Sequence, residues 1–276
     1  MTIARGRASI LLYHDPSAET LDRHLAYLAT RYSFVSLSTL VDAIRERRWS
    51  SLPPRPLVVT FDDGHRRNAL LAGTLERHGV VPTIYACSEI VGTSRHYWFL
   101  ETQDPEPLKP LANAERLRLL ERHTGYLPAR EYPGNRQALS RGEVAELCGI
   151  VEFGAHTRFH PVLTTCDDAE CEREIARSKV EIEGLVGGVC RHFSYPNGDH
   201  GEREIDHVRR AGYASARSTD VGWNGPATDP YRLKILGTSD DASVNRLATD
   251  LTGISGFVAR ARMGRFDGSH RPVARS

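Results

Sequence analysis

Two adjacent carboxylates mark one candidate for chemistry in this chain of 276 residues. Asp62 and Asp63 end a strongly apolar run and are followed by Gly64. Neighbouring side chains of a strand point to opposite faces, but a turn that starts at Asp63 can bring both carboxylates to the mouth of a sheet. One can then bind a metal ion while the other takes a proton from an activated water. The same residues also fit an ordinary structural turn.

A second candidate is the pair His156 and His160, which follows the predicted strand at 151–153. Two histidines four residues apart lie on one face if the segment turns helically, and metal sites use this spacing. Two unrelated surface imidazoles are the alternative. Both candidates follow the carboxyl ends of predicted parallel strands, where barrels have their active sites. Their positions together favour a metal centre.

Short β-type runs alternate with longer helical patterns through most of the chain, which predicts a parallel sheet or barrel. Strands are expected at 9–13, 57–61, 83–87, 150–153, 192–195, 213–216 and 231–235. Helices are expected at 19–32, 67–78, 113–122, 167–185 and 202–211.

A single catalytic domain is expected over residues 1–260. Residues 91–137 interrupt the alternation with five prolines and the run Tyr97-Trp98-Phe99, so we interpret them as an insertion. It is either a lid over substrate or a packed excursion. Residues 261–276 are expected to be a flexible basic tail.

Composition limits the classes of partner. The chain has 36 basic and 35 acidic residues, so its net charge gives no case for nucleic acid binding. No apolar run is long enough to span a membrane. Five cysteines without a CxxC pair fit reduced thiols, and no export signal is visible, so we expect a cytoplasmic location. The oligomeric state stays open.

Three motifs together resemble the polysaccharide deacetylase family, the NodB-homology enzymes of carbohydrate esterase family 4. They are Thr60-Phe-Asp-Asp-Gly64, His156-Thr-x-x-His160 and Phe193-Ser-Tyr-Pro-Asn-Gly198, and the resemblance covers residues 8 to 250. It implies a distorted, incomplete (β/α) barrel. It also implies that Asp63, His156 and His160 hold a metal ion and that Asp62 is the general base.

The third motif departs from the commonest family form, because Ser194-Tyr-Pro-Asn-Gly198 lacks the arginine that contacts the base in many members. Arg232 is the candidate to replace that arginine, and a purely structural Arg232 is the alternative. The backbone N–H of Asn197 matches the family's donor to the oxyanion.

The family's C-terminal Leu-x-His motif, which supplies the catalytic acid, is missing as well. Tyr13-His14 resembles the N-terminal element of the branch that de-N-acetylates poly-N-acetylglucosamine. We therefore expect His14 to be the general acid, which is reasonable because the first and last strands of a barrel are neighbours. A histidine that merely caps the strand is the alternative.

The resemblance implies hydrolysis of the N-acetyl group of amino sugars, with acetate released from an oligosaccharide, polysaccharide or glycan precursor. Zinc is the expected ion, although Co²⁺, Ni²⁺, Fe²⁺ or Mn²⁺ also suits two histidines and a carboxylate. Trp98 and Trp223 either stack on a sugar or belong to the core or rim. The rival functions are hydrolysis of another amide, such as a small cyclic imide or a natural-product or lipid-linked amino sugar, and carbohydrate binding by an inactive homologue.

Overall fold

Parallel β-strands form one sheet in the computed structural model, which describes residues 6–253. The strands are β1 (Ser9–Tyr13), β2 (Ser33–Phe34), β3 (Pro56–Phe61), β4 (Thr83–Ala86), β5 (Glu152–Ala155), β6 (His192–Ser194), β7 (Ser215–Val221) and β8 (Leu233–Gly237). Their order is β1-β8-β7-β6-β5-β4-β3-β2, and β1 also pairs with β3. This extra pairing closes a barrel of seven strands and leaves β2 outside it, so the expected incomplete (β/α) barrel is confirmed.

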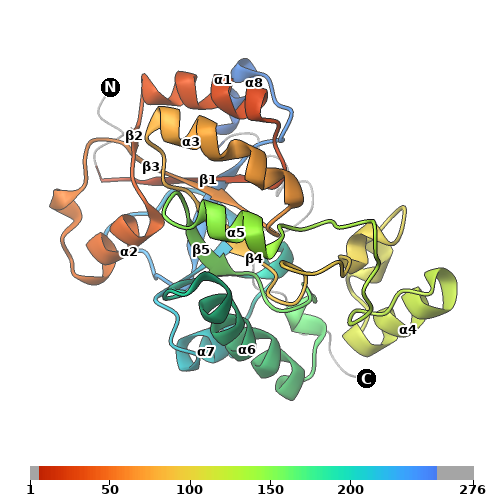
Figure 1. Cartoon of the computed structure of the whole chain (residues 1–276). Helices are drawn as coiled ribbons and strands as arrows, with labels where there is room; N and C mark the ends of the chain where they lie inside the picture. Colours follow the sequence, from red (N-terminus) through yellow and green to blue (C-terminus); the bar gives the residue numbers. More distant parts are fainter. Residues whose placement is uncertain (1–5, 254–276) are drawn as a thin grey trace.

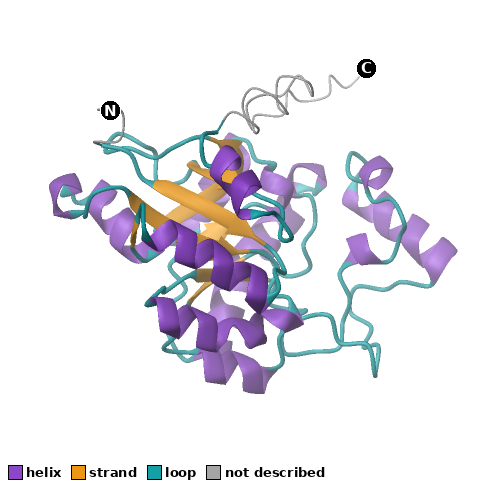
Figure 2. Ribbon diagram, turned by 90° about the horizontal axis from the view of Figure 1, so that it is seen from above, coloured by secondary structure: helices purple, strands orange, loops and turns teal. Residues whose placement is uncertain are grey.

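Helices surround the barrel, except α4, which lies to one side of it (Figures 1 and 2). They are α1 (Ala18–Ala29), α2 (Leu37–Arg45), α3 (Ala72–His78), α4 (Asn113–Thr124), α5 (Arg141–Leu147), α6 (Asp168–Val186), α7 (Glu202–Arg210) and α8 (Val244–Asp250). Helix α1 packs against α3 and α8, and α6 packs against α5 and α7. The outer shell is therefore continuous around much of the barrel.

Alternation along the strands separates two hydrophobic clusters. On β1, Ile10 and Leu12 belong to the smaller cluster, while Leu11 and Tyr13 belong to the larger one. The smaller cluster also takes in the apolar face of α2, whereas the larger one takes in residues of the outer helices. Because side chains alternate between the two faces of a strand, the smaller cluster fills the barrel interior and α2 packs against it.

Most of the expected elements are present within a few residues of their predicted ends. Gly79 ends α3 in the left-handed conformation, as its position after the helical pattern predicts. Sequence analysis missed three short helices, α2, α5 and α8, and the two-residue strand β2. Helix α2 carried a readable signal, since the Ser36 side chain accepts from the Thr39 N–H and caps its first turn.

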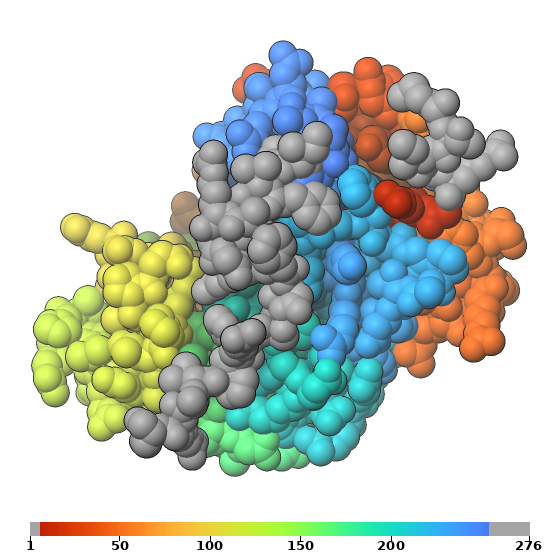
Figure 3. Space-filling model, turned by 180° about the vertical axis from the view of Figure 1, so that it is seen from behind, coloured from red at the N-terminus to blue at the C-terminus, as the bar shows by residue number. Residues whose placement is uncertain are grey.

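The 91–137 segment forms a lobe beside the barrel (Figure 3), and it contains α4. Its core is a separate cluster of Trp98, Leu120 and Tyr126 together with Val162 from outside the segment. The expected basic tail at 261–276 lies outside the described residues. No helix within residues 6–253 is both long and apolar enough to cross a membrane, and all five cysteines are free thiols.

Candidate active site

The sequence motifs converge at the carboxyl edge of the barrel, because all of its strands are parallel. The strand geometry of β3 extends to Asp62, whose N–H donates to Tyr13 O of β1 at 3.0 Å. The chain then turns through left-handed conformations at Asp63 (φ 69°) and Gly64 (φ 76°). A Cβ atom on Gly64 would lie 2.9 Å from Val91 Cγ2, so the turn requires glycine.

Asp63, His156 and His160 form a cluster that could hold a metal ion, and all three side chains are buried. Asp63 Oδ1 lies 3.5 Å from His156 Nε2 and 3.3 Å from His160 Nε2. Oxygen and nitrogen ligands of tetrahedral zinc, at bond lengths near 2.0 Å, are separated by about 3.3 Å. The spacing of these atoms therefore fits a single ion.

The hydrogen bonds of the cluster also fit a metal ion. Asp63 Oδ1 is buried and has no hydrogen-bond partner among the described residues, while its Oδ2 lies 3.1 Å from His65 Nε2. His156 Nδ1 lies 2.8 Å from Ser194 O, so Nδ1 donates and the Nε2 lone pair faces the cluster. One carboxylate oxygen and two imidazole nitrogens are thus left for the same position.

The protonation states suit metal binding too. Burial lowers the pKa of His160 to about 3, which keeps this imidazole neutral at physiological pH. Burial alone would raise the pKa of Asp63, but the hydrogen bond to His65 and the nearby imidazoles of His160 and His156 hold it well below its ordinary value. The cluster therefore offers an anionic oxygen and a neutral nitrogen donor, which is the form in which such groups bind metals.

The segment that carries the two histidines is an irregular turn, so the histidines meet without the helical turn that their spacing would allow. Thr157 and His160 have left-handed conformations, with φ of 66° and 58°. The buried carboxylate of Glu174 on α6 stabilises this turn, since its Oε2 accepts from Arg158 N at 2.8 Å and Phe159 N at 3.0 Å. Hydrogen bonds to Glu174, which is distant in the sequence, stabilise the turn that brings the two histidines together.

Arg217 of β7 is the arginine that contacts Asp62, and sequence analysis missed it. Its Nη2 donates to both carboxylate oxygens of Asp62, and the Arg217 side chain is fully buried. The same Nη2 donates to Ser194 Oγ at 2.5 Å. Asp62 Oδ2 also lies 3.9 Å from His156 Nε2, so this carboxylate borders the metal cluster while paired with a cation.

The prediction that Arg232 orients Asp62 is therefore wrong. Leu233 and Ile235 face the barrel interior, and the alternation of side chains places Arg232 on the outer face. There its guanidinium is 36% exposed and pairs with Glu202 and Asp229.

Strand register explains how Arg217 reaches Asp62. Ser194 and Arg217 are direct partners in the pairing of β6 with β7. Ser194 is small, so the guanidinium of its neighbour can pass it and reach Asp62. The alternation of side chains along β7 indicates which of its residues face the barrel interior. The pairing of β6 with β7 is also needed to place Arg217 beside Ser194.

His14 follows β1 directly beside Asp62, because β1 and β3 are adjacent parallel strands in register. It is exposed at the rim. Its backbone is fixed by two side chains, since its N–H donates to Asp240 Oδ1 at 3.0 Å and its carbonyl accepts from Asn68 Nδ2 at 2.9 Å. Asp240 lies just beyond β8, which pairs with β1 as expected for the first and last strands of the barrel.

Asn197 lies in the turn that follows β6, in a left-handed conformation with φ of 57°. Its carbonyl accepts from Thr219 Oγ1 at 3.1 Å, and its Nδ2 is buried without a hydrogen-bond partner among the described residues. A Cβ on the next residue, Gly198, would lie 2.1 Å from Thr219 Oγ1, so this close approach to β7 requires glycine.

The two candidate sugar-stacking tryptophans are both at least partly buried. Trp98 is 2% exposed, and the Arg116 guanidinium lies 4.7 Å from its ring centre. Trp223 is partly buried and packs against the larger hydrophobic cluster, with Arg7 over its ring. Trp98 is therefore a core residue, as the alternative interpretation proposed.

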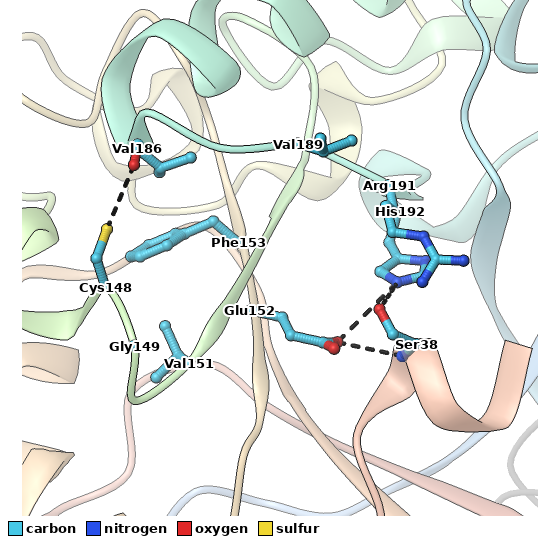
Figure 4. A pocket seen from close by; sticks show the side chains of 10 residues that line it. All are labelled: Ser38, Cys148, Gly149, Val151, Glu152, Phe153, Val186, Val189, Arg191 and His192. Carbon is cyan, nitrogen blue, oxygen red and sulfur yellow. Dashed lines mark hydrogen bonds and ion pairs between the residues drawn. The ribbon is translucent and has the colours of Figure 1, made fainter. Parts of the chain in front are cut away.

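A separate cavity of about 320 Å³ lies at the first residues of β5 and β6 (Figure 4). Glu152 Oε2 accepts from Ser38 N, and His192 Nε2 lies 2.9 Å from Ser38 Oγ. Arg191 pairs with Asp42. These polar groups contact one another at the amino ends of the strands, where barrel residues typically contribute to stability.

Comparison with known proteins gives the family. The profile of the polysaccharide deacetylase family matches residues 50–216, more than half of the chain, and the chain therefore belongs to this family. None of the curated proteins matches it significantly.

Several solved structures share the fold. The deacetylase PplD of Streptococcus pyogenes, solved with acetate, is 16% identical with a TM-score of 0.66 over 88% of this chain and 97% of that one. IcaB from Ammonifex degensii is 19% identical, with a TM-score of 0.65 over 88% and 96%. A de-N-acetylase from Aggregatibacter actinomycetemcomitans is 17% identical, with a TM-score of 0.64 over 88% and 99%.

The Asp62–Arg217 pair gives a first prediction. Arg217→Met leaves a buried carboxylate without its cation and should lower the free energy of unfolding by about 3–5 kcal/mol. Arg232→Met removes a half-exposed guanidinium and should cost about 1 kcal/mol or less. Urea unfolding of both variants measures the difference. Equal losses would contradict the assignment of Arg217 as the partner of Asp62.

Glu174 gives a second prediction, on pH. Burial raises its pKa from 4.5 to about 7, although the N–H groups of Phe159 and Arg158 and the charge of Arg158 oppose the rise. The native state therefore keeps a proton that the unfolded chain releases, so the free energy of unfolding should fall as the pH rises from 4.5 to about 7, by up to about 3 kcal/mol.

Glu174→Gln keeps an acceptor for both N–H groups and should remove this fall. Glu172→Gln, which changes an exposed carboxylate of the same helix, should leave it in place. Urea titrations at several pH values test this, and parallel pH profiles for wild type and Glu174→Gln would refute it.

Proposed function

We propose that the chain is a metal-dependent hydrolase that removes the acetyl group from N-acetylated amino sugars and releases acetate. The substrate would be an oligosaccharide, a polysaccharide or a glycan precursor. One observation carries the proposal. Asp63, His156 and His160 present three ligand atoms at zinc-like spacing, and directly beside them Asp62 is a second carboxylate, held by Arg217. Hydrolysis requires both a metal position and a neighbouring base.

The ion would be Zn²⁺ by default, because zinc favours three protein ligands and an open position in hydrolytic sites. Co²⁺, Ni²⁺, Fe²⁺ or Mn²⁺ would suit the same donors. When bound, a divalent ion polarises the acetyl carbonyl and lowers the pKa of water toward ~7.

Two residues of the chain would then transfer protons, Asp62 as the base and His14 as the acid. Asp62 takes a proton from the water as its oxygen attacks the carbonyl carbon, and the Arg217 guanidinium keeps both carboxylate oxygens oriented. The backbone N–H of Asn197 donates to the carbonyl oxygen as negative charge develops there. His14 gives a proton to the amide nitrogen, the C–N bond breaks, and acetate and the free amine leave.

Family membership supports a carbohydrate substrate, and the likeness to deacetylase structures is consistent with it. The five free thiols are compatible with the predicted cytoplasmic location, where a glycan precursor would be the available substrate. Hydrolysis of another amide and carbohydrate binding without turnover are the outcomes that the following experiment separates.

Asp62→Asn should lower acetate release from N-acetylglucosamine oligomers by about 10²- to 10⁴-fold, because the amide cannot accept the proton. Metal-reconstituted wild type, Asp62→Asn and Asp206→Asn are compared, with metal content measured in each. Asp206 is an exposed carboxylate on α7, and its variant should match wild type. No acetate from metal-loaded wild type would contradict the substrate class. Turnover of other amides or saturable sugar binding would then identify the function.

His14→Gln should lower the rate by about 10²- to 10⁴-fold on the amide substrate but much less on an activated acetyl ester, whose leaving group departs without a proton. The ratio of the two rates distinguishes an acid from a residue that only supports the strand. His123→Gln, which changes an exposed imidazole on α4, is the control. Equal losses on both substrates would rule out His14 as the acid.

A further inference from the structure

We propose that the aromatic run Tyr97-Trp98-Phe99 is a positioning element for the metal ligands, through hydrogen bonds to the backbone carbonyls of Asp63 and His160. The inference rests on the metal site of the proposed function. It assigns a role to the 91–137 segment, which the mechanism does not otherwise use.

Tyr97 contacts the first ligand. Its hydroxyl donates to Asp63 O at 2.7 Å, and its side chain is fully buried. The Cys87 N–H also approaches this carbonyl, but at 3.4 Å, which is long for an N–H···O bond. The tyrosine therefore makes the shorter of the two hydrogen bonds that fix the orientation of this peptide.

Trp98 contacts another ligand in the same way. Its Nε1–H donates to His160 O at 2.7 Å, and its side chain is 2% exposed. Phe99 adds a packing contact, because its ring meets the His160 ring edge to face with centroids 4.8 Å apart. Three consecutive residues thus approach two ligands from the side of the lobe.

These carbonyls matter because of the backbone conformation of the ligands. Asp63 and His160 both have positive φ, which costs about 1 kcal/mol or more for a residue other than glycine. Such conformations persist only where surrounding contacts fix them. A hydrogen bond to the residue's own carbonyl fixes its ψ, and with it the direction from which the side chain approaches the metal position.

Other residues of the lobe contact the aromatic run. The Arg116 guanidinium lies over the Trp98 ring, and its Nη1 lies 3.3–3.5 Å from the carbonyl oxygens of Leu108, Lys109 and Leu111. The Tyr97 N–H donates to Gln137 Oε1 at 2.8 Å. The run is therefore packed between the rest of the lobe and the turns that carry Asp63 and His160.

Tyr97→Phe removes only the hydroxyl and should weaken metal binding by about 10- to 100-fold, the usual effect of losing an outer contact to a ligand. Tyr231→Phe is the matched control, because its hydroxyl also donates to a backbone carbonyl, that of Tyr213 at 3.0 Å, outside the lobe and away from the ligands. Dissociation constants for Zn²⁺ are measured by competition with a chelator, and Co²⁺ absorption spectra report the ligand geometry.

Weaker Zn²⁺ binding and an altered Co²⁺ spectrum in Tyr97→Phe but not in Tyr231→Phe would support the proposal. Wild-type metal affinity and spectrum in Tyr97→Phe would overturn it. Thermal unfolding with chelator present shows whether each apoprotein is folded, and Trp98→Phe provides a second test at His160. A wild type that binds metal without releasing acetate would contradict the proposed function alone, and one that binds no metal would overturn both.

Discussion

Two neighbouring carboxylates are buried at the end of one strand, and the site is organised around stabilising them. Asp62 and Asp63 are 4% and 3% exposed. An ionised carboxylate that leaves water costs several kcal/mol unless it is paired. Asp62 is neutralised by the guanidinium of Arg217, whereas Asp63 faces only imidazoles. The two environments give identical side chains different chemistry, because one charge is already balanced and the other is left to attract a cation.

The residues of the candidate metal cluster and the neighbouring Asp62 could be predicted from the sequence because their signals are local. Asp62, Asp63 and His156 lie within two residues of the ends of β3 and β5, His160 follows four residues after His156, and parallel strands bring such positions to one edge. Arg217 could not be found in this way, since its function depends on the register of β6 against β7. The conformation of the segment from His156 to His160 could not be predicted from its spacing for a related reason. The conformation there depends on Glu174, a residue of α6 that spacing within the turn cannot reveal.

The elements that sequence analysis missed are short. Helix α2 has nine residues and packs against the barrel interior, so its stability comes from tertiary contacts more than from its own pattern. The closing of seven strands into a barrel likewise depends on the pairing of β1 with β3, which excludes β2 from the ring. Local periodicity predicts which segments form strands and helices. The pairing of strands that are distant in the sequence determines how many strands form the barrel.

The position of Arg217 has a consequence for how such sites can change over time. Every inward residue in one layer of a closed barrel faces the same small volume, whichever strand carries it. A guanidinium can therefore be supplied from β7 while Ser194 occupies the corresponding place on β6, and Asp62 receives the same charge. In such a layer, the charge beside Asp62 matters more than the strand that carries the charged residue. Position by position, the sequence shows a serine at 194 where the commonest family motif has arginine, whereas the barrel layer contains a guanidinium supplied from β7.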